Sequence, residues 1–359
     1  MRLGRIARLQ TEMSLAGVDV ALFSVGPDLP YLTGYQARPS ERLNMLVVHR
    51  EGDAALVVPR LEAPLVEASG ASLIVWDETD DPLDHVASAC RGSKRVAIGD
   101  HTWSVFLVRL MDRLENVEWV EGSRITGPLR IVKDASEVAA LRAAAHAADR
   151  VAVRIPGEVR FGGRTEAEVA TDIKRMLVEE GHQTAEFAIV GSGPNGASPH
   201  HEPGSRAIRE GDLVVCDFGG TWDGYHSDLT RTFSVGQPDE TAREVHQVVW
   251  EANRAGREAI APGVPCQEID RATRRVVEEA GYGEFFIHRT GHGIGLEVHE
   301  HPYLVEGNAD VLAPGMAFSV EPGIYLPGRL GVRIEDIIVC GENSADELNE
   351  ARRDLVSLE

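Results

Sequence analysis

The 359-residue sequence contains no uninterrupted apolar run close to the roughly 18 residues that a membrane-spanning helix requires. Residues 1–17 carry basic side chains but neither an apolar core nor a cleavage site, so they predict an amphipathic helix and not a signal peptide. Cysteine is scarce, and the four thiols form no Cys-x-x-Cys pair: Cys90, Cys216, Cys266 and Cys340. Two disulfides are an alternative, but free thiols, a reducing compartment and a cytoplasmic location are favoured in a chain without a signal sequence.

Positive charge is also in short supply. The 36 lysines and arginines are outnumbered by 57 aspartates and glutamates, which gives a net charge of −21. A surface this acidic repels phosphate backbones and anionic lipid, so we expect neither nucleic acid nor a membrane as partner. The length predicts two domains, each large enough to bury a core.

The first third of the chain alternates strand and helix patterns, which predicts an α/β domain. We expect strands at 18–25, 46–49, 54–58, 72–76 and 95–98, and helices at 61–68 and 105–113. The pair Gly127-Pro128 punctuates the chain, and Asp134 with Glu137 is typical of the capped start of a long helix. We therefore predict domains at residues 1–127 and 128–359.

The second domain contains a faint internal repeat with an offset of 100 residues. Residues 168–182 and 268–282 both have the pattern of an amphipathic helix that stops at glycine. Each is followed by a His-containing turn, a glycine turn, an apolar strand ending in an acid, and a second acid. The acids of the first half are Asp217 and Asp228, and those of the second half are Glu321 and Glu335. Chance similarity of two helices is the alternative, but duplicated halves would bring four carboxylates to one central site.

An Asp-Gly pair at 223–224 lies between two apolar runs, which is the strongest short signal of a β-hairpin. If this pair forms a two-residue turn, Asp217 lies opposite Thr230, and Asp228 projects from the same face as Asp217. An acid that follows the apolar run 213–216 needs a metal or a charged partner. The plainer alternative is two exposed aspartates on an edge hairpin.

Histidines gather in a glycine-rich segment further along: His288, His292, His299 and His301. Two later apolar strand patterns, 318–325 and 331–339, each enclose an acid, Glu321 and Glu335, although an ion pair with Arg333 would also account for Glu335. Carboxylates combined with imidazole suit Mn, Co, Fe or Zn better than a thiolate site would.

Five motifs in this order resemble those of the pita-bread metallopeptidases, which include aminopeptidase P, prolidase and methionine aminopeptidase: VVCDFGG, HSDLTRTF, GHGIGLEVHE, SVEPGIY and GVRIEDII. The resemblance covers residues 130 to 345, and the segment 31–34 resembles the creatinase-type domain of prolidases. It implies an α/β N-terminal creatinase-type domain and an α+β pita-bread catalytic domain with an internal pseudo-two-fold duplication.

The resemblance also implies a site for two divalent metal ions, with Mn favoured and Co, Zn or Fe as alternatives. The implied metal ligands are Asp217, Asp228, His292, Glu321 and Glu335, of which Asp228 and Glu335 would bridge both ions. The implied catalytic residues are Glu321, His200, His288, His299 and Arg333, and His200 and His299 would also bind substrate. For His299, a packed core histidine is the alternative. No ligand position departs from the family pattern, which weighs against its metal-free members.

We therefore predict hydrolysis of the peptide bond before proline in Xaa-Pro dipeptides, by a hydroxide that bridges the metals. Aminopeptidase P activity on longer peptides is the main alternative, and a lyase or hydrolase of a small non-peptide and a non-catalytic peptide-binding module are remoter ones. The loop around Arg38 and Arg42 resembles one that reaches the partner's site in dimeric dipeptidases. We therefore expect a homodimer in which one of these arginines binds the substrate carboxylate, with a solvated surface loop as the alternative.

Overall fold

The computed structural model describes residues 2–66 and 71–358. The chain divides into two compact units, Met1–Arg130 and Ile131–Glu359. The boundary expected between residues 127 and 128 falls inside helix α5 (Ser123–Arg130), which continues through Pro128. No helix of the described segments is long and apolar enough to cross a membrane. All four cysteines are free, as expected from the sequence, and the structure shows that they are buried.

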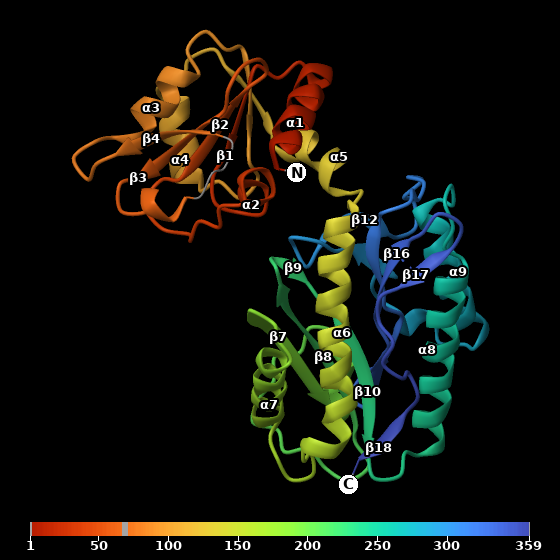
Figure 1. Ribbon diagram of the computed structural model, residues 1–359. Helices are drawn as coiled ribbons and strands as arrows, with labels where there is room; N and C mark the ends of the chain where they lie inside the picture. The colour runs from red at the N-terminus through yellow and green to blue at the C-terminus, as the bar shows by residue number, and fades with distance from the viewer. Residues whose placement is uncertain (1, 67–70, 359) are drawn as a thin grey trace. The chain divides into compact units, whose positions relative to one another are not determined.

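The first unit is built on a six-stranded sheet in the order β4-β3-β2-β1-β5-β6. Figure 1 labels β1 to β4 of this sheet. Its strands are β1 (Val20–Phe23), β2 (Met45–His49), β3 (Ala55–Pro59), β4 (Ser72–Trp76), β5 (Arg95–Ile98) and β6 (Glu118–Glu121). The five predicted strands are confirmed. β6 was not predicted, because its apolar stretch of Trp119 and Val120 is too short to carry a pattern.

The helices of this unit are α1 (Arg2–Ala16), α2 (Asp28–Thr33), α3 (Pro82–Ala89), α4 (Ser104–Met111) and α5, of which α2 and α5 contact α1. The helices predicted at 1–17 and 105–113 are confirmed by α1 and α4. The helix predicted at 61–68 is wrong over its described part, since only the 3₁₀ turn Ala63–Leu65 forms and Val66 is extended. Leu61 and Leu65 stay exposed, so this segment has no buried apolar face to stabilise a helix. Residues 67 and 68 lie outside the described residues.

The second unit places long helices against strands (Figure 1). Its helices are α6 (Ala135–Glu158), α7 (Glu166–Glu179), α8 (Glu240–Glu258) and α9 (Cys266–Glu279). The capping box predicted from Asp134 and Glu137 is present at the start of α6. One sheet has the order β18-β10-β8-β7, with β9 paired to β8; a second has the order β12-β11-β13-β16-β17; β14 and β15 form a ribbon.

The strands of the second unit belong to these two sheets and to the ribbon. The first sheet contains β7 (Thr184–Ser192), β8 (Leu213–Trp222), β9 (Tyr225–His226), β10 (Leu229–Val235) and β18 (Val356–Leu358). The second contains β11 (Gly291–Gly293), β12 (Glu300–Leu304), β13 (Ala317–Val320), β16 (Asp336–Cys340) and β17 (Ala345–Glu347). The ribbon consists of β14 (Gly323–Leu326) and β15 (Leu330–Arg333).

The two halves repeat one order of elements. α7 and α9 are both 14 residues long and begin 100 residues apart, and each ends before a glycine of positive φ, Gly181 and Gly281. Each half then continues into a sheet that carries one pair of acids. This order is the duplication expected from the sequence, and it gives each half one pair of the acids.

Candidate metal centre

A β-hairpin presents the first two acids. β8 and β10 pair antiparallel with Asp217 opposite Thr230, as predicted. β8 turns into β9 at Asp223 and Gly224, whose φ angles of 49° and 80° are those that a two-residue turn of this kind requires. The Asp217 and Asp228 side chains are buried, which excludes exposed edge aspartates. One detail was wrong: the strand does not end at Asp217 but continues to Trp222.

His292 and Glu321 come from the second half of the unit. His292 lies in β11, and Glu321 directly follows β13. The Ser319 hydroxyl accepts a hydrogen bond from the His292 backbone N–H at 3.0 Å and donates one to Glu321 Oε1 at 3.1 Å. His292 Nδ1 lies 3.1 Å from the carbonyl oxygen of Gly293. A carbonyl oxygen only accepts, so the ring proton is on Nδ1 and Nε2 presents its lone pair.

Glu335 occupies a break between strands. Residues 331–339 were predicted as one strand, but β15 and β16 belong to different sheets and the chain must cross between them. At the crossing, the Thr230 hydroxyl donates to Glu335 Oε2 at 2.7 Å. The alternative of an ion pair between Arg333 and Glu335 is wrong. Arg333 pairs with Asp217 instead, and its Nη2 donates to Asp217 Oδ2 at 2.6 Å.

The five predicted ligands converge in one pocket of about 670 Å³. His292 Nε2 lies 3.6 Å from Asp228 Oδ2, 3.3 Å from Glu321 Oε1 and 4.0 Å from Glu335 Oε1. One ligand atom each from Asp228, His292 and Glu335 fall within 4.8 Å of one another. Asp217 lines the same pocket.

The donor set fits divalent cations. Asp217 Oδ1 and Glu335 Oε1 are buried and receive no hydrogen bond from any residue that the structure describes. The lone pair of His292 Nε2 faces carboxylate oxygens, which are acceptors too. Acceptors buried against acceptors are stable only with a proton or a cation between them. Oxygen ligands with one imidazole nitrogen suit Mn, Co, Fe or Zn.

The pKa values of the metal-free cluster also indicate a cation site. Burial, followed by the charge of Glu335, holds the pKa of Asp228 well above its usual range, and burial with the charge of Glu321 does the same for Glu335. Burial raises the pKa of Glu321 to about 7. Burial also lowers the pKa of His292 to about 3, so the imidazole is neutral and available as a ligand. Bound cations would relieve the carboxylate repulsion.

Three further predicted histidines line this pocket: His200, His288 and His299. His299 is exposed, and its ring meets that of His292 edge-on at 4.1 Å, so the alternative of a packed core histidine is wrong. His288 is tied down: Nδ1 faces the carbonyl oxygen of Arg289 at 2.7 Å, and Nε2 lies 2.9 Å from the Tyr325 hydroxyl. Since Nδ1 must donate, Nε2 accepts from Tyr325.

Tyr325 and Thr230 were not singled out from the sequence. The Tyr325 hydroxyl accepts from Arg333 Nη1 at 2.9 Å, and Arg333 Nε donates to Thr230 Oγ1 at 3.1 Å. These contacts hold the guanidinium against Asp217. Thr230 could have been found from the hairpin register, which puts it opposite Asp217, whereas the role of Tyr325 depends on the pairing of β14 with β15.

Glu166 is a second residue that the sequence did not reveal. This fully buried carboxylate, at the start of α7, accepts from the Ser192 N–H and hydroxyl at 2.8 and 2.6 Å, from Asn195 Nδ2 and from the Gly204 N–H, and lies 2.8 Å from His201 Nε2. The Glu166 carboxylate therefore anchors both ends of the segment 192–204, which carries His200.

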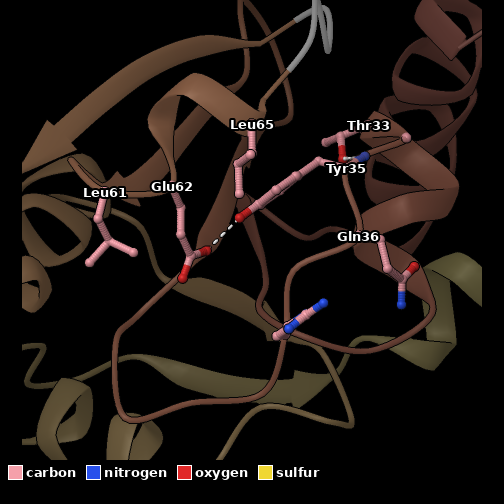
Figure 2. A pocket seen from close by; sticks show the side chains of 8 residues that line it. Thr33, Tyr35, Gln36, Leu61, Glu62 and Leu65 are labelled. Atoms are coloured by element: carbon pink, nitrogen blue, oxygen red, sulfur yellow. Dashed lines mark hydrogen bonds between the residues drawn. The ribbon is translucent and has the colours of Figure 1, made fainter.

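The predicted substrate arginines belong to the first unit. Arg42 is engaged by its neighbours, with Nη1 2.7 Å from Glu41 and Nε 2.8 Å from Glu78. Arg38 lines a separate cavity of about 700 Å³ in this unit. Figure 2 shows the cavity wall, where Tyr35 donates to Glu62 at 2.5 Å. Arg42 is therefore held in ion pairs, whereas Arg38 lines a cavity.

The fold and this site define a protein that holds divalent cations on carboxylates and an imidazole, and comparison with known proteins identifies it as a metallopeptidase. Residues 139–342 match the model of metallopeptidase family M24, and residues 5–132 match the Creatinase/Prolidase N-terminal domain. A protein of Mycobacterium tuberculosis named "Probable dipeptidase PepE" is 46% identical, covering 99% of this chain and 95% of the relative.

Solved structures are similar over the same length. The prolidase of Thermococcus sibiricus has a TM-score of 0.95 and 36% identity, covering 99% of this chain and 98% of that one. The X-Pro aminopeptidase of Thermotoga maritima has a TM-score of 0.87 and 28% identity, covering 98% and 99%. The chain belongs to metallopeptidase family M24. It is a metallopeptidase with a creatinase-type N-terminal domain and a pita-bread catalytic domain, and it uses divalent metal.

Proposed function

We propose that this protein is an Xaa-Pro dipeptidase that binds two divalent cations, with Mn²⁺ favoured. The observation that carries this proposal is the convergence of four carboxylates and a neutral imidazole in one pocket, with two buried acceptor oxygens that lack donors among the described residues. The names of the relatives support the substrate class, since dipeptidase and prolidase names accompany higher identities than the X-Pro aminopeptidase name does.

The assignment of ligands follows from the two halves. Asp217 would bind one ion, His292 and Glu321 the other, and Asp228 and Glu335 both. The supporting geometry is that Asp228 and Glu335 both come close to His292 Nε2, at 3.6 and 4.0 Å. Arg333 would orient Asp217 and balance one negative charge, because its 2.6 Å bond occupies the second carboxylate oxygen.

The bound cations would polarise the carbonyl before proline and lower the pKa of the attacking water. Glu321 is the residue that we assign to proton transfer, from that water to the proline nitrogen. The nitrogen of an Xaa-Pro bond carries no hydrogen, so it leaves poorly unless it is protonated. The Ser319 hydroxyl, which donates to Glu321 Oε1, holds the carboxylate in place for this step.

His299 and His200 are assigned to substrate contacts. Both are exposed and line the pocket, so they are accessible to a peptide. A donor that stabilises the developing oxyanion contributes about 10²–10³ in rate. His288 is also assigned to the catalytic residues. Its hydrogen bond from Tyr325, which in turn accepts one from Arg333, supports a role in holding Arg333 in position.

We also propose a homodimer in which the Arg38 loop borders the partner's pocket. Arg38 is the better of the two arginines for this role, since Arg42 is already paired with Glu41 and Glu78. A cytoplasmic location is supported by four free thiols, which persist in a reducing compartment.

The test is hydrolysis of matched substrates. Ala-Pro and Ala-Pro-Ala are incubated with the full chain after EDTA treatment and addition of Mn²⁺, Co²⁺ or Zn²⁺ separately. We expect Mn²⁺-dependent cleavage of Ala-Pro at least tenfold faster than that of the tripeptide. Faster cleavage of the tripeptide would identify an aminopeptidase P, and cleavage of neither peptide would refute the proposal.

A further inference from the structure

His299 lines the metal pocket without a hydrogen bond to hold its side chain. Among the residues that the structure describes, its ring meets that of His292 edge-on at 4.1 Å but takes part in no hydrogen bond or ion pair. His288 and His292 differ, since in each a ring nitrogen lies against a carbonyl oxygen, at 2.7 and 3.1 Å. The position of the His299 imidazole is therefore set by its backbone, and an error of about 1 Å in such a position costs about 10²-fold in rate.

The segment 293–300 joins β11 to β12 and carries His299. The carbonyl oxygen of Gly295 accepts a hydrogen bond from the His226 N–H at 2.9 Å, which anchors the beginning of the segment. The other end is Glu300, the first residue of β12 and the direct neighbour of His299 in the chain. A fixed Glu300 therefore leaves His299 little freedom to move.

Glu300 is fixed by a buried ion pair with Lys133. The Nζ atom of Lys133 donates to Glu300 Oε1 at 2.8 Å, and the two side chains are only 1% and 9% exposed. The carboxylate also packs against Gly295, where a Cβ atom would lie 2.6 Å from Oε1. The Glu300 side chain therefore connects Lys133 to the turn at Gly295, and glycine leaves the room that the carboxylate occupies.

Lys133 is itself held at its backbone. Its N–H donates to the carbonyl oxygen of Gly315 at 2.9 Å, and Val132 before it forms a β-bridge with Met316. Asp134 after it caps α6. The ammonium group therefore extends from a fixed point of the catalytic unit.

Stability alone does not account for this buried ion pair. Taking two charges out of water costs a desolvation free energy that their attraction barely offsets, and apolar replacements of similar volume are often neutral or stabilising. Contact with the substrate does not account for it either, because neither Lys133 nor Glu300 is among the residues that line the pocket. What the pair provides is a fixed position for the residue next to it.

We propose that the ion pair of Lys133 and Glu300 positions His299 for the reaction and holds its imidazole beside His292. This inference rests on the proposed function, in which His299 contacts the substrate, and deepens it by naming the residues that place this group. Loss of the pair acts through His299, so turnover falls. The metal ligands stay in place, because the His292 backbone is held separately by Ser319.

The first experiment uses the double variant Lys133→Met with Glu300→Gln, measured on the Mn²⁺-reconstituted full chain with Ala-Pro as substrate. Both substitutions keep the side-chain size and leave no charge unpaired, so metal content and Tm should stay close to those of wild type. We expect kcat to fall about 10- to 100-fold and KM to change less than about threefold. In a His299→Ala background the same substitutions should change kcat less than about threefold, because the group through which they act is gone.

The second experiment observes His299 without turnover. Histidine rings are labelled with ¹³C in the EDTA-treated full chain, and the NMR signal of His299 is identified by its absence from His299→Ala. The double variant should shift or broaden this signal. The matched control is Arg271→Met with Glu306→Gln, which neutralises an exposed ion pair just beyond the end of β12 and should alter neither the signal nor kcat.

Glu300→Asp is a second variant, which keeps both charges and shortens the reach to Lys133 by one methylene. It should also shift the His299 signal and lower kcat about tenfold, and it decides the matter if the double variant does not fold. An unchanged His299 signal in a folded variant overturns the inference, and so does an equal fall in kcat with and without His299. If wild type hydrolyses no proline peptide, the proposed function fails, and the NMR comparison still decides whether the pair positions His299.

Discussion

Replacing Glu321 by glutamine should stabilise the metal-free protein at pH 8 far more than at pH 5. In the folded protein the pKa of Glu321 is raised to about 7 by burial and by the charge of Asp217, against a value of 4.5 in an ordinary setting. Between these two values the unfolded chain releases the proton while the folded chain keeps it. A raised acid pKa therefore lowers stability as pH rises through the window from about 4.5 to 7.

The magnitude follows from the size of the shift. Each unit of pKa difference corresponds to about 1.4 kcal/mol, so full ionisation of Glu321 costs about 3 kcal/mol at pH 8. At pH 5, near the lower end of this window, the folded carboxyl stays protonated and the unfolded one has lost only part of its proton. The loss of stability at this pH is therefore about 1 kcal/mol. Glutamine has the shape of the neutral acid and carries no such cost. For a unit of this size, 3 kcal/mol corresponds to roughly 6–12 °C in Tm.

The assay is thermal unfolding of EDTA-treated wild type and Glu321→Gln at pH 5 and pH 8, followed by circular dichroism. Addition of Mn²⁺ identifies the transition of the catalytic unit, because only that transition should rise. With Mn²⁺ the order should reverse at pH 8, since wild type regains the ligand that the variant lacks. The exposed Glu284 offers a matched control, and its glutamine variant should follow wild type at both pH values.

Two results would contradict this reasoning. The first is a stabilisation by Glu321→Gln that is equal at both pH values, which would mean that packing and not charge distinguishes the side chains. The second is a metal-free wild type that matches the variant at pH 8. Either result would show that Glu321 does not add to a repulsive cluster that cations relieve.

Three further changes test other parts of the site. Asp228→Ala should lower both bound Mn²⁺, measured by atomic absorption, and activity, and a variant that retains two ions would remove Asp228 from the ligand set. His299→Ala should reduce kcat about 10²–10³-fold with unchanged metal content and Tm, because the side chain is exposed; near-normal kcat would leave the role to other donors. Glu166→Gln should lower Tm and raise KM while metal content stays constant, since an amide NH₂ replaces one of the two accepting oxygens and leaves the buried donors that faced it without an acceptor, at about 1–3 kcal/mol each; unchanged KM would show that this anchor does not position the pocket wall.

Periodicity and turn chemistry made much of the fold predictable. The strands of the first unit, the capped start of α6 and the hairpin at Asp223 and Gly224 are encoded by residues close together in the chain. The hairpin even gave the register that sets Asp217 opposite Thr230, because a two-residue turn leaves no freedom in the pairing. The helix expected at 61–68 failed, since its apolar residues find no surface to cover.

The sequence by itself determined which side chains carry the chemistry, because five motifs in one order name the acids and the histidine. Only the tertiary structure decided how they act together. Contacts such as that of Arg333 with Asp217 join residues 116 positions apart, and the break at Glu335 arises because its flanking strands belong to different sheets. No local pattern encodes such pairings.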